Sequence, residues 1–415
     1  MVPLASPEYG ATLDSLNRDY AGRIQHLSQY ENFEAQGPPL YYAVAAAWYK
    51  LGAILGIHSG PLAYWVRFLN PLFYGLLVWL SYCFVRRVHP ENDFLCVAVP
   101  ALLAVFPQDV FFGMNRDVLS PTLWAGALLL MVDAVAGARS GARSMLLASL
   151  LVGLGFLLEL SNCVLYVALL SALWSWLHHG QTSVRNKIRV TSLSVTAAFL
   201  PPFLWMRRNY VVMGNLTGTR AKLEFLGWTM KPLREMLHHP LFHFDGFRFF
   251  VRGLISTFWF GEYRWHDVLM RSVSADRFYV VSTLVFLLIF ALNFGWNWRT
   301  MPSVQRWVDW QALLAVAGSV LFLAAMSLAF DYHNSGYPSS VHPFFVSGRI
   351  ISGVLLPFTF LYAGGLETLT ERSRRWIPAG AVLACLLLFI TVSEIRVRSV
   401  VFSSPYNFFA IESRR

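Results

Sequence analysis

Apolar blocks of roughly membrane-spanning length recur along almost the whole chain, and this recurrence restricts the fold more than any other feature. About ten such blocks, each near the ~20 residues that a helix needs to cross a bilayer, are separated by polar connections. They lie at 64–85, 94–107, 117–137, 145–159, 160–178, 190–206, 278–295, 308–329, 350–367 and 376–394. We therefore predict an all-α, polytopic membrane protein that forms a single membrane-embedded domain over residues 1–415.

The composition agrees with this fold class. Of the 415 residues, 56% are hydrophobic and only 13% are charged, whereas soluble domains carry about a quarter charged residues. The formal net charge of +10 would suggest nucleic acid as the partner of a soluble chain, but here the basic residues stand in short clusters between apolar blocks. We expect them to set the topology and to contact membrane lipid, with no nucleic-acid partner.

Basic clusters follow every second apolar block, and this alternation predicts the orientation. They are Arg86 and Arg87; Arg139 and Arg143; Arg185, Lys187 and Arg189; Arg299 and Arg306; and Arg372, Arg374 and Arg375. Because positive charge in short loops marks the cytoplasmic side, the connections at 108–116, 207–277 and 331–349 are expected to face outward. Function is then expected on the outer face, where 207–277 forms a large loop, in a protein of the bacterial inner membrane.

The block at 40–57 mixes aromatic residues and a lysine with small residues, and it has two interpretations. As an amphipathic helix lying in the membrane interface, it would join residues 1–63 into a polar head on the outer face. As an ordinary span, it would place the residues before it in the cytoplasm. We favour the interfacial helix.

Several outer segments carry a family resemblance. The run QGPPLYY at 36–42 resembles the end of the first outer loop in membrane glycosyltransferases of the GT-C superfamily, which includes the protein O-mannosyltransferases. The element WMRRN at 205–209, followed by glycines at 214 and 218, is similar to the one that opens their large outer loop. The run SGR at 347–349, with Pro357 beyond it, is similar to their Gly-Arg-Tyr…Pro element, and NRD at 115–117 looks like the Asn-Asn-Asp of the subgroup called DUF2142.

This resemblance implies transfer of a sugar from a polyprenyl-phosphate donor to a cell-envelope acceptor on the outer face. Such transfer needs a carboxylate as general base and positive charge on the leaving phosphate. The candidate catalytic residues are Glu34 and Asp117, with a divalent metal possible but without a recognisable ligand set. The candidate substrate-binding residues are Gln36, Asn115, Arg208, Asn209, His342 and Arg349.

The chain departs from the family where related chains carry an acidic motif after a first transmembrane helix, because that helix and motif are missing. Either the sequence starts late, which we favour, or a carboxylate of the head substitutes, or the chain is a degenerate accessory subunit. For Asp117 a helix N-cap is an equally good explanation, and for Arg208 and Arg349 contact with lipid headgroups is. A transporter or flippase of a lipid-linked substrate is the alternative function.

Overall fold

The computed structural model describes residues 37–138, 140–179, 183–265, 268–333, 338–372 and 378–402. The all-α prediction is confirmed: helices make up most of these residues, and the strands among them are two-residue pairs. The elements of the first half are α2 (Leu40–Ile54), α3 (Ser59–Arg67), α4 (Leu69–Val88), α5 (Asp93–Ala104), the 3₁₀ turns η2 (Asp109–Phe112) and η3 (Arg116–Val118), α6 (Ser120–Val135), α7 (Gly141–Phe156), η4 (Leu160–Val164), α8 (Leu165–His179) and α9 (Val184–Met213).

The second half begins with a large loop between two long helices. It contains α10 (Arg220–Leu226), β1 (Thr229–Met230), α11 (Leu233–Met236), η5 (Pro240–Phe242), α12 (Phe244–Phe260), β2 (Arg264–Trp265) and β3 (Val268–Leu269). Then follow α13 (Val273–Asn297), α14 (Ser303–Ala329), β4 (Phe330–Asp331), η6 (Gly348–Val354), α15 (Leu355–Arg372) and α16 (Ala379–Phe402). The antiparallel pairs are β1 with β4 and β2 with β3.

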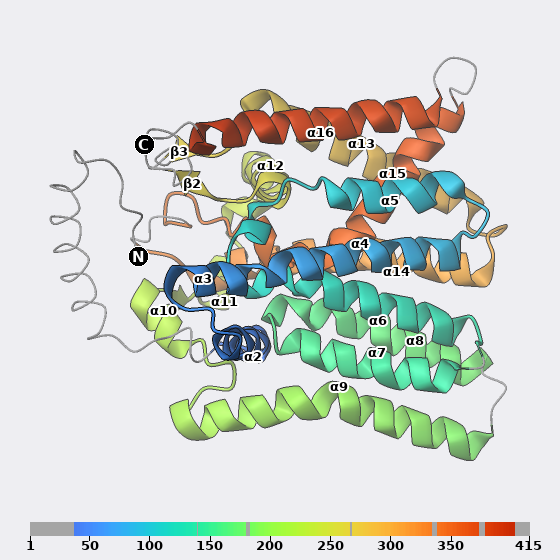
Figure 1. Cartoon of the computed structure of the whole chain (residues 1–415), viewed down its shortest axis with the longest axis horizontal. Coiled ribbons are helices and arrows are strands. Elements are labelled where there is room, and N and C mark those ends of the chain that lie inside the picture. Colours follow the sequence, from blue (N-terminus) through green and yellow to red (C-terminus); the bar gives the residue numbers. More distant parts are fainter. Residues whose placement is uncertain are drawn as a thin grey trace, which may run out of the picture.

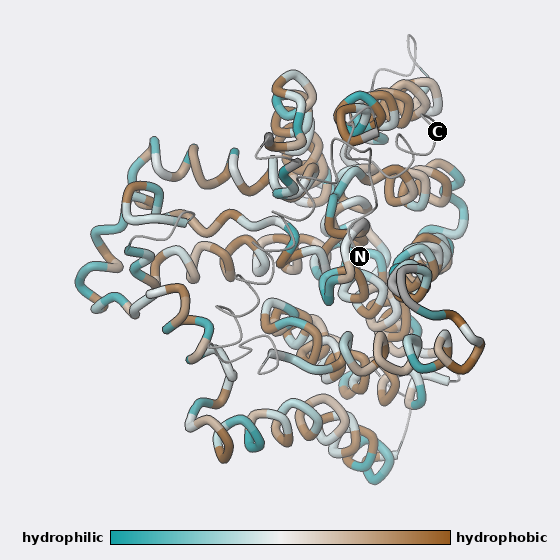
Figure 2. The backbone as a smooth tube through the Cα atoms, turned by 60° about the vertical axis from the view of Figure 1, so that its left-hand side comes forward, coloured by the Kyte–Doolittle hydropathy of each residue, from teal (hydrophilic) through white to brown (hydrophobic). Residues whose placement is uncertain are grey.

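Within the described residues, eight helices are long and apolar enough to cross a membrane. They are Tyr64–Val88, Arg116–Val135, Leu160–His178, Val184–Met213, Val273–Asn297, Ser303–Ala329, Gly348–Glu371 and Ala379–Val401. Two shorter apolar helices, α5 and α7, occupy the remaining predicted blocks. Figure 2 shows hydrophobic residues along the helices and hydrophilic residues gathered at the turns. The chain is thus a polytopic membrane protein.

The helices that precede the predicted basic clusters end on the same side of the bundle. The C-terminal ends of α4, α6, α8, α13 and α15 all lie at the right of Figure 1, and the described part of the large loop lies at the left. At the right-hand end the Nε atom of Arg87 lies 2.6 Å from Oδ1 of Asp133, which joins α4 to α6. The alternation in the sequence therefore corresponds to two chemically distinct ends.

Helix α15 is the most enclosed part of the bundle. Along its apolar stretch, 89% of the residues are buried, compared with 28% along the corresponding stretches of α9, α13, α14 and α16. Its Gly365 permits close approach to α13, because a Cβ atom there would lie 2.0 Å from the carbonyl oxygen of Phe286. The protein therefore shields one late helix with earlier ones and with α16.

Helix α2 runs across the bundle, and Figure 1 shows it end-on while α4, α6 and α7 lie lengthwise. Its 15 residues span about 22 Å, less than the ~30 Å of a hydrocarbon core. Trp48 of α2 and Trp65 of α3 stack with ring centroids 4.5 Å apart, and each indole N–H donates to the other residue's carbonyl at 2.8 Å. Residues 40–57 thus contain a helix that is shorter than a span, and the interfacial interpretation stays a prediction.

Glycine at position 52 is required for this contact between α2 and α3. A Cβ atom on Gly52 would lie 2.4 Å from the ring of Trp65, whereas one on Gly75 of α4 would meet nothing within 4 Å among the described residues. We expect Gly52→Ala to destabilise the fold by about 1–3 kcal/mol through overpacking, and Gly75→Ala to leave stability equal or higher, since alanine favours helices. Thermal unfolding in detergent measures both, and equal midpoints for the two variants would contradict the prediction.

Candidate active site

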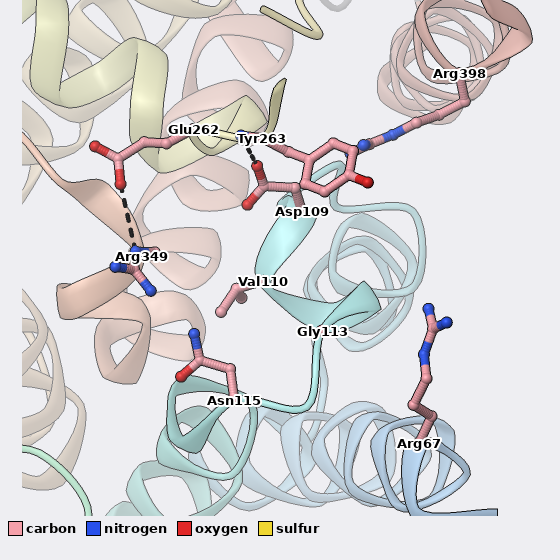
Figure 3. Close-up of a pocket in the computed structure, with 9 residues that line it drawn as sticks. All are labelled: Arg67, Asp109, Val110, Gly113, Asn115, Glu262, Tyr263, Arg349 and Arg398. Carbon is pink, nitrogen blue, oxygen red and sulfur yellow. Dashed lines mark hydrogen bonds and ion pairs between the residues drawn. The ribbon is translucent and has the colours of Figure 1, made fainter. Parts of the chain in front are cut away.

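At the end of the bundle that carries the large loop, five separate parts of the chain surround a cavity of about 380 Å³. Figure 3 shows its lining: a residue of α3, four of the connection between α5 and α6, two that follow α12, one of η6 and one of α16. In chain order these are Arg67, Asp109, Val110, Gly113, Asn115, Glu262, Tyr263, Arg349 and Arg398. Three guanidinium groups therefore face two carboxylates in one hollow.

Two buried amides fix the connection between α5 and α6. The side-chain N–H₂ of Asn70, on α4, donates to the carbonyls of Phe111 at 2.9 Å and Gly113 at 2.7 Å. The amide of Gln108 donates to the carbonyls of Thr257 and Phe258 at 3.0 and 2.8 Å. These last two carbonyls belong to the final turn of α12, where the carbonyl of Thr257 also accepts the backbone N–H of Gly261 at 2.9 Å. Gln108 thus caps α12 and at the same time places the residue that follows it.

That following residue is Asp109, and the chain after α12 is shaped around its carboxylate. The carboxylate accepts a hydrogen bond from the backbone N–H of Tyr263. Gly261 has a φ of +87°, in the left-handed region that favours glycine, and a Cβ atom there would lie 2.0 Å from the carboxyl group. Burial raises the pKa of Asp109, although this hydrogen bond and the charge of Arg398 act in the opposite direction.

Arg349 bridges two carboxylates at the other side of the cavity. Its Nε lies 3.3 Å from Oε2 of Glu262, and its Nη1 lies 3.4 Å from Oδ2 of Asp117. The hydroxyl of Ser347 also donates to Glu262, at 2.6 Å. The segment approaches α12 so closely that a Cβ atom on Gly348 would lie 2.3 Å from the backbone nitrogen of Phe258. A glycine is therefore needed immediately before this arginine.

Asp117 is only 3% exposed and lies behind Arg349. It does not cap a helix: the side chain of Asn115 accepts its backbone N–H at 3.2 Å, and the N-cap position of α6 is Leu119. The hydroxyl of Ser352 donates to its backbone carbonyl at 2.9 Å. The helix-cap interpretation of Asp117 is therefore wrong, and its catalytic role stays a prediction.

A second ion pair lies beside Asp117, between Arg116 and Glu159. The Nε of Arg116 is 2.6 Å from Oε2 of Glu159, and both side chains are largely shielded from solvent. Glu159 follows the end of α7, so the two apolar blocks predicted at 145–159 and 160–178 are separated by an interruption between α7 and η4. Charged groups beneath the cavity are therefore paired with one another.

The structure brings together some of the residues predicted from sequence and separates others. Asn115 and Arg349 line the cavity, and Asp117 contacts Arg349. Arg208 and Asn209 lie on α9, hydrogen-bonded to each other at 2.9 Å, and neither lines the cavity. Three further positions complete the set: His342 stacks on Phe249 with centroids 5.3 Å apart, and Glu34 and Gln36 lie outside the described residues.

Four of the charged residues that line the cavity were not among the site residues predicted from the sequence: Arg67, Asp109, Glu262 and Arg398. Asp109 stands in the short polar connection between two apolar blocks, which is a usable signal. Arg398 gave no signal, because an arginine near a helix end is also expected from contact with headgroups. Within the described part of the chain, no group of three or more His, Cys, Asp or Glu residues is arranged to hold a metal ion.

The chain shows only limited similarity to known proteins. No protein-family model and no curated protein matches this chain. Among solved structures, the archaeal oligosaccharyltransferase AglB from Archaeoglobus fulgidus, in complex with an inhibitory peptide and a dolichol-phosphate, has a TM-score of 0.43 at 12% identity, over 91% of this chain and 48% of that one. An oligosaccharyltransferase from the same organism, in complex with Zn and sulfate, has a TM-score of 0.39 at 12% identity, over 91% and 44%. This chain spans about half their length, and likeness at this level carries no conclusion about activity.

Proposed function

We propose that this protein is an integral-membrane glycosyltransferase that moves a sugar from a polyprenyl-phosphate donor to a hydroxyl group of a cell-envelope acceptor. The observation that carries the proposal is the cavity itself, in which the carboxylates of Asp109 and Glu262 share one hollow with three guanidinium groups. Carboxylate and guanidinium are the groups that this reaction needs, the first to take a proton and the second to hold a phosphate.

The position of the cavity supports an active site on the outer face. It lies at the end of the bundle opposite the five basic connections, and short connections rich in arginine and lysine mark the cytoplasmic side. A polyprenyl chain then stays in the bilayer while its phosphate and sugar enter from the membrane boundary. This route requires no passage of the sugar through the apolar part of the bundle.

Asp109 is the proposed general base. The acceptor oxygen forms a bond to the anomeric carbon, the bond from that carbon to the phosphate oxygen breaks, and the acceptor proton passes to the carboxylate. Glu262 suits this role less well, because it is already paired with Arg349. Burial raises the pKa of Asp109, which makes its carboxylate a better proton acceptor. Asp117, held behind Arg349, positions that arginine, and Glu34 stays a prediction.

The three guanidiniums are the proposed site for the leaving phosphate. Negative charge gathers on the phosphate oxygens as the glycosidic bond breaks, and guanidinium binds such oxygens in a bidentate manner. Arg349 is held in place by two carboxylates, while Arg67 and Arg398 enter from α3 and α16. The polyprenyl phosphate is thereby released in its charged form.

Proteoliposomes that contain the purified protein, a polyprenyl-phosphate sugar with a radiolabelled saccharide and a set of envelope acceptors provide the test. The proposal predicts a labelled product that survives mild acid, which cleaves the donor's phosphate linkage but leaves an ordinary glycosidic bond intact. Movement of the labelled lipid between leaflets without such a product would instead identify a flippase. If no donor class gave either a product or movement of the lipid, only an accessory role would remain.

The pH dependence of transfer follows from the burial of Asp109. Because its pKa is raised and the base must be ionised, activity should fall with decreasing pH, with a midpoint above the ordinary aspartate value of about 3.9. Rate profiles of the parent and of Glu224→Gln, an exposed carboxylate paired with Arg220, should coincide, whereas Asp109→Glu should move the midpoint. A midpoint that is identical in all three proteins would remove Asp109 as the titrating group.

A further inference from the structure

A second cavity of about 380 Å³ lies between α13 and α16, outside the candidate active site. Its lining changes character from one end to the other. The residues at the start of α13 and near the outer end of α16 are polar, and those deeper along α16 are mainly apolar. The lining is formed by Ser272, Ser274, Ala275, Cys385, Leu388, Phe389, Val392, Ser393 and Arg396.

The two helices run antiparallel here, so the polar ends coincide. The ring of Phe278 contacts that of Phe389 in a tilted arrangement with centroids 4.5 Å apart, and the hydroxyl groups of Tyr279 and Ser393 lie 3.0 Å apart. One turn further out, Ser272 and Ser274 therefore lie at the level of Arg396. The hydroxyls of the two serines are 3.0 Å apart, and the side chain of Ser272 does not cap α13. One cation and two hydroxyls thus stand at the mouth of an apolar groove.

Arg396 and Arg398 serve different cavities. Two positions apart on an α-helix, side chains point about 200° from each other, and Arg398 lines the candidate active site while Arg396 lines this groove. Arg398 is paired with Glu394 at 2.5 Å. For Arg396 the described part of the chain contains no ion pair. An anion held by Arg396 would therefore lie on the far side of α16 from Asp109 and Arg349.

The length of the groove corresponds to one leaflet. From Cys385 to Arg396, α16 rises about 16 Å, close to half of the ~30 Å hydrocarbon core of a bilayer. An acyl chain of one leaflet matches this length with its phosphate at Arg396, whereas a long polyprenyl chain exceeds it. A zwitterionic headgroup would bring its own cation toward the guanidinium, but an anionic one would not.

From these observations we infer that the groove between α13 and α16 is a binding site for an anionic phospholipid of the outer leaflet. The phosphate contacts Arg396 and the hydroxyls of Ser272 and Ser274, and one acyl chain lies along Leu388, Phe389 and Val392. This inference does not rest on the proposed transferase activity, because the site lies on the opposite side of α16.

Binding of phosphatidylglycerol to the full-length protein in detergent, followed by native mass spectrometry, tests the inference. We expect Arg396→Ala to lower the affinity about tenfold, as for the loss of one charge-assisted contact. Val392→Trp, at a position that is 53% exposed, should lower it comparably by filling the apolar groove. Arg234→Ala, an exposed arginine of α11, is the matched control and should bind as the parent does.

Cys385, the exposed cysteine that lines the groove, provides an independent measurement. In nanodiscs, replacing phosphatidylcholine with phosphatidylglycerol should slow labelling of Cys385 by an apolar maleimide in the parent but not in Arg396→Ala. Equal affinity and equal labelling in the parent and Arg396→Ala would overturn the inference. Tighter Arg396-dependent binding of a polyprenyl phosphate than of phosphatidylglycerol would also overturn it. Neither readout depends on sugar transfer.

Discussion

Asp109→Asn is expected to lower the rate of sugar transfer by about 10²- to 10⁴-fold, the contribution typical of a general base. The asparagine amide has nearly the same shape, and its oxygen can still accept the N–H of Tyr263, so the fold around Gly261 should persist. What is lost is the ability to take a proton from the acceptor. Initial rates in proteoliposomes measure this loss.

Two further variants show whether a loss of transfer in Asp109→Asn comes from the lost carboxylate. Asp93→Asn changes an aspartate with a 95% exposed side chain at the opposite end of the bundle, and it should transfer at the parental rate. Asp109→Glu retains a carboxylate and should keep more activity than Asp109→Asn. Parental transfer by Asp109→Asn with an unchanged thermal midpoint would show that another group removes the proton.

Arg349→Ala is expected to have the second large effect, on both stability and transfer. It leaves the carboxylate of Asp117, 3% exposed, without the guanidinium that lies 3.4 Å from it. Removal of one partner from a fully buried ion pair costs about 3–5 kcal/mol, and the cost here should be smaller because the side chain of Arg349 is 42% exposed. Transfer should also fall because the leaving phosphate loses a bidentate contact. Thermal unfolding in detergent and initial transfer rates measure the two effects separately.

A double variant separates the structural role of Arg349 from its proposed role in catalysis. Arg349→Ala combined with Asp117→Asn removes the buried charge together with its partner, so part of the stability should return while transfer stays low. Arg220→Ala, a 66% exposed arginine on α10, controls for the loss of a surface cation. If transfer recovered along with stability, Arg349 would be a structural residue only.

The sequence was sufficient for the bundle because each span is encoded locally. An apolar block near 20 residues predicts a helix wherever it stands, and each predicted block is a helix in the structure. Boundaries were less well predicted: α9 runs from Val184 to Met213, whereas its block was placed at 190–206. Helical hydrogen bonding continues beyond the apolar part, and hydropathy does not record that continuation.

The site was predicted only in part because it depends on which segments meet. Asn115, Asp117 and Arg349 were predicted because each stands in a short run that resembles a motif of the GT-C superfamily. Asp109 was missed, since its importance comes from Gln108 and Gly261, which hold it against the end of α12. Conversely, Arg208 stands in a run that resembles a motif of the superfamily, but it lies on α9 and does not line the cavity.

The burial of α15 has a consequence for how the protein is made. Helices emerge from the ribosome in chain order. The membrane-spanning helices from α4 to α14 therefore enter the bilayer before α15, the most enclosed helix, has been made. When α15 docks, Arg349, which precedes the first turn of α15, reaches carboxylates that are already present on earlier segments. Enclosure of α15 and placement of Arg349 are thus one late event, and α16, which follows, brings the last lining residue, Arg398.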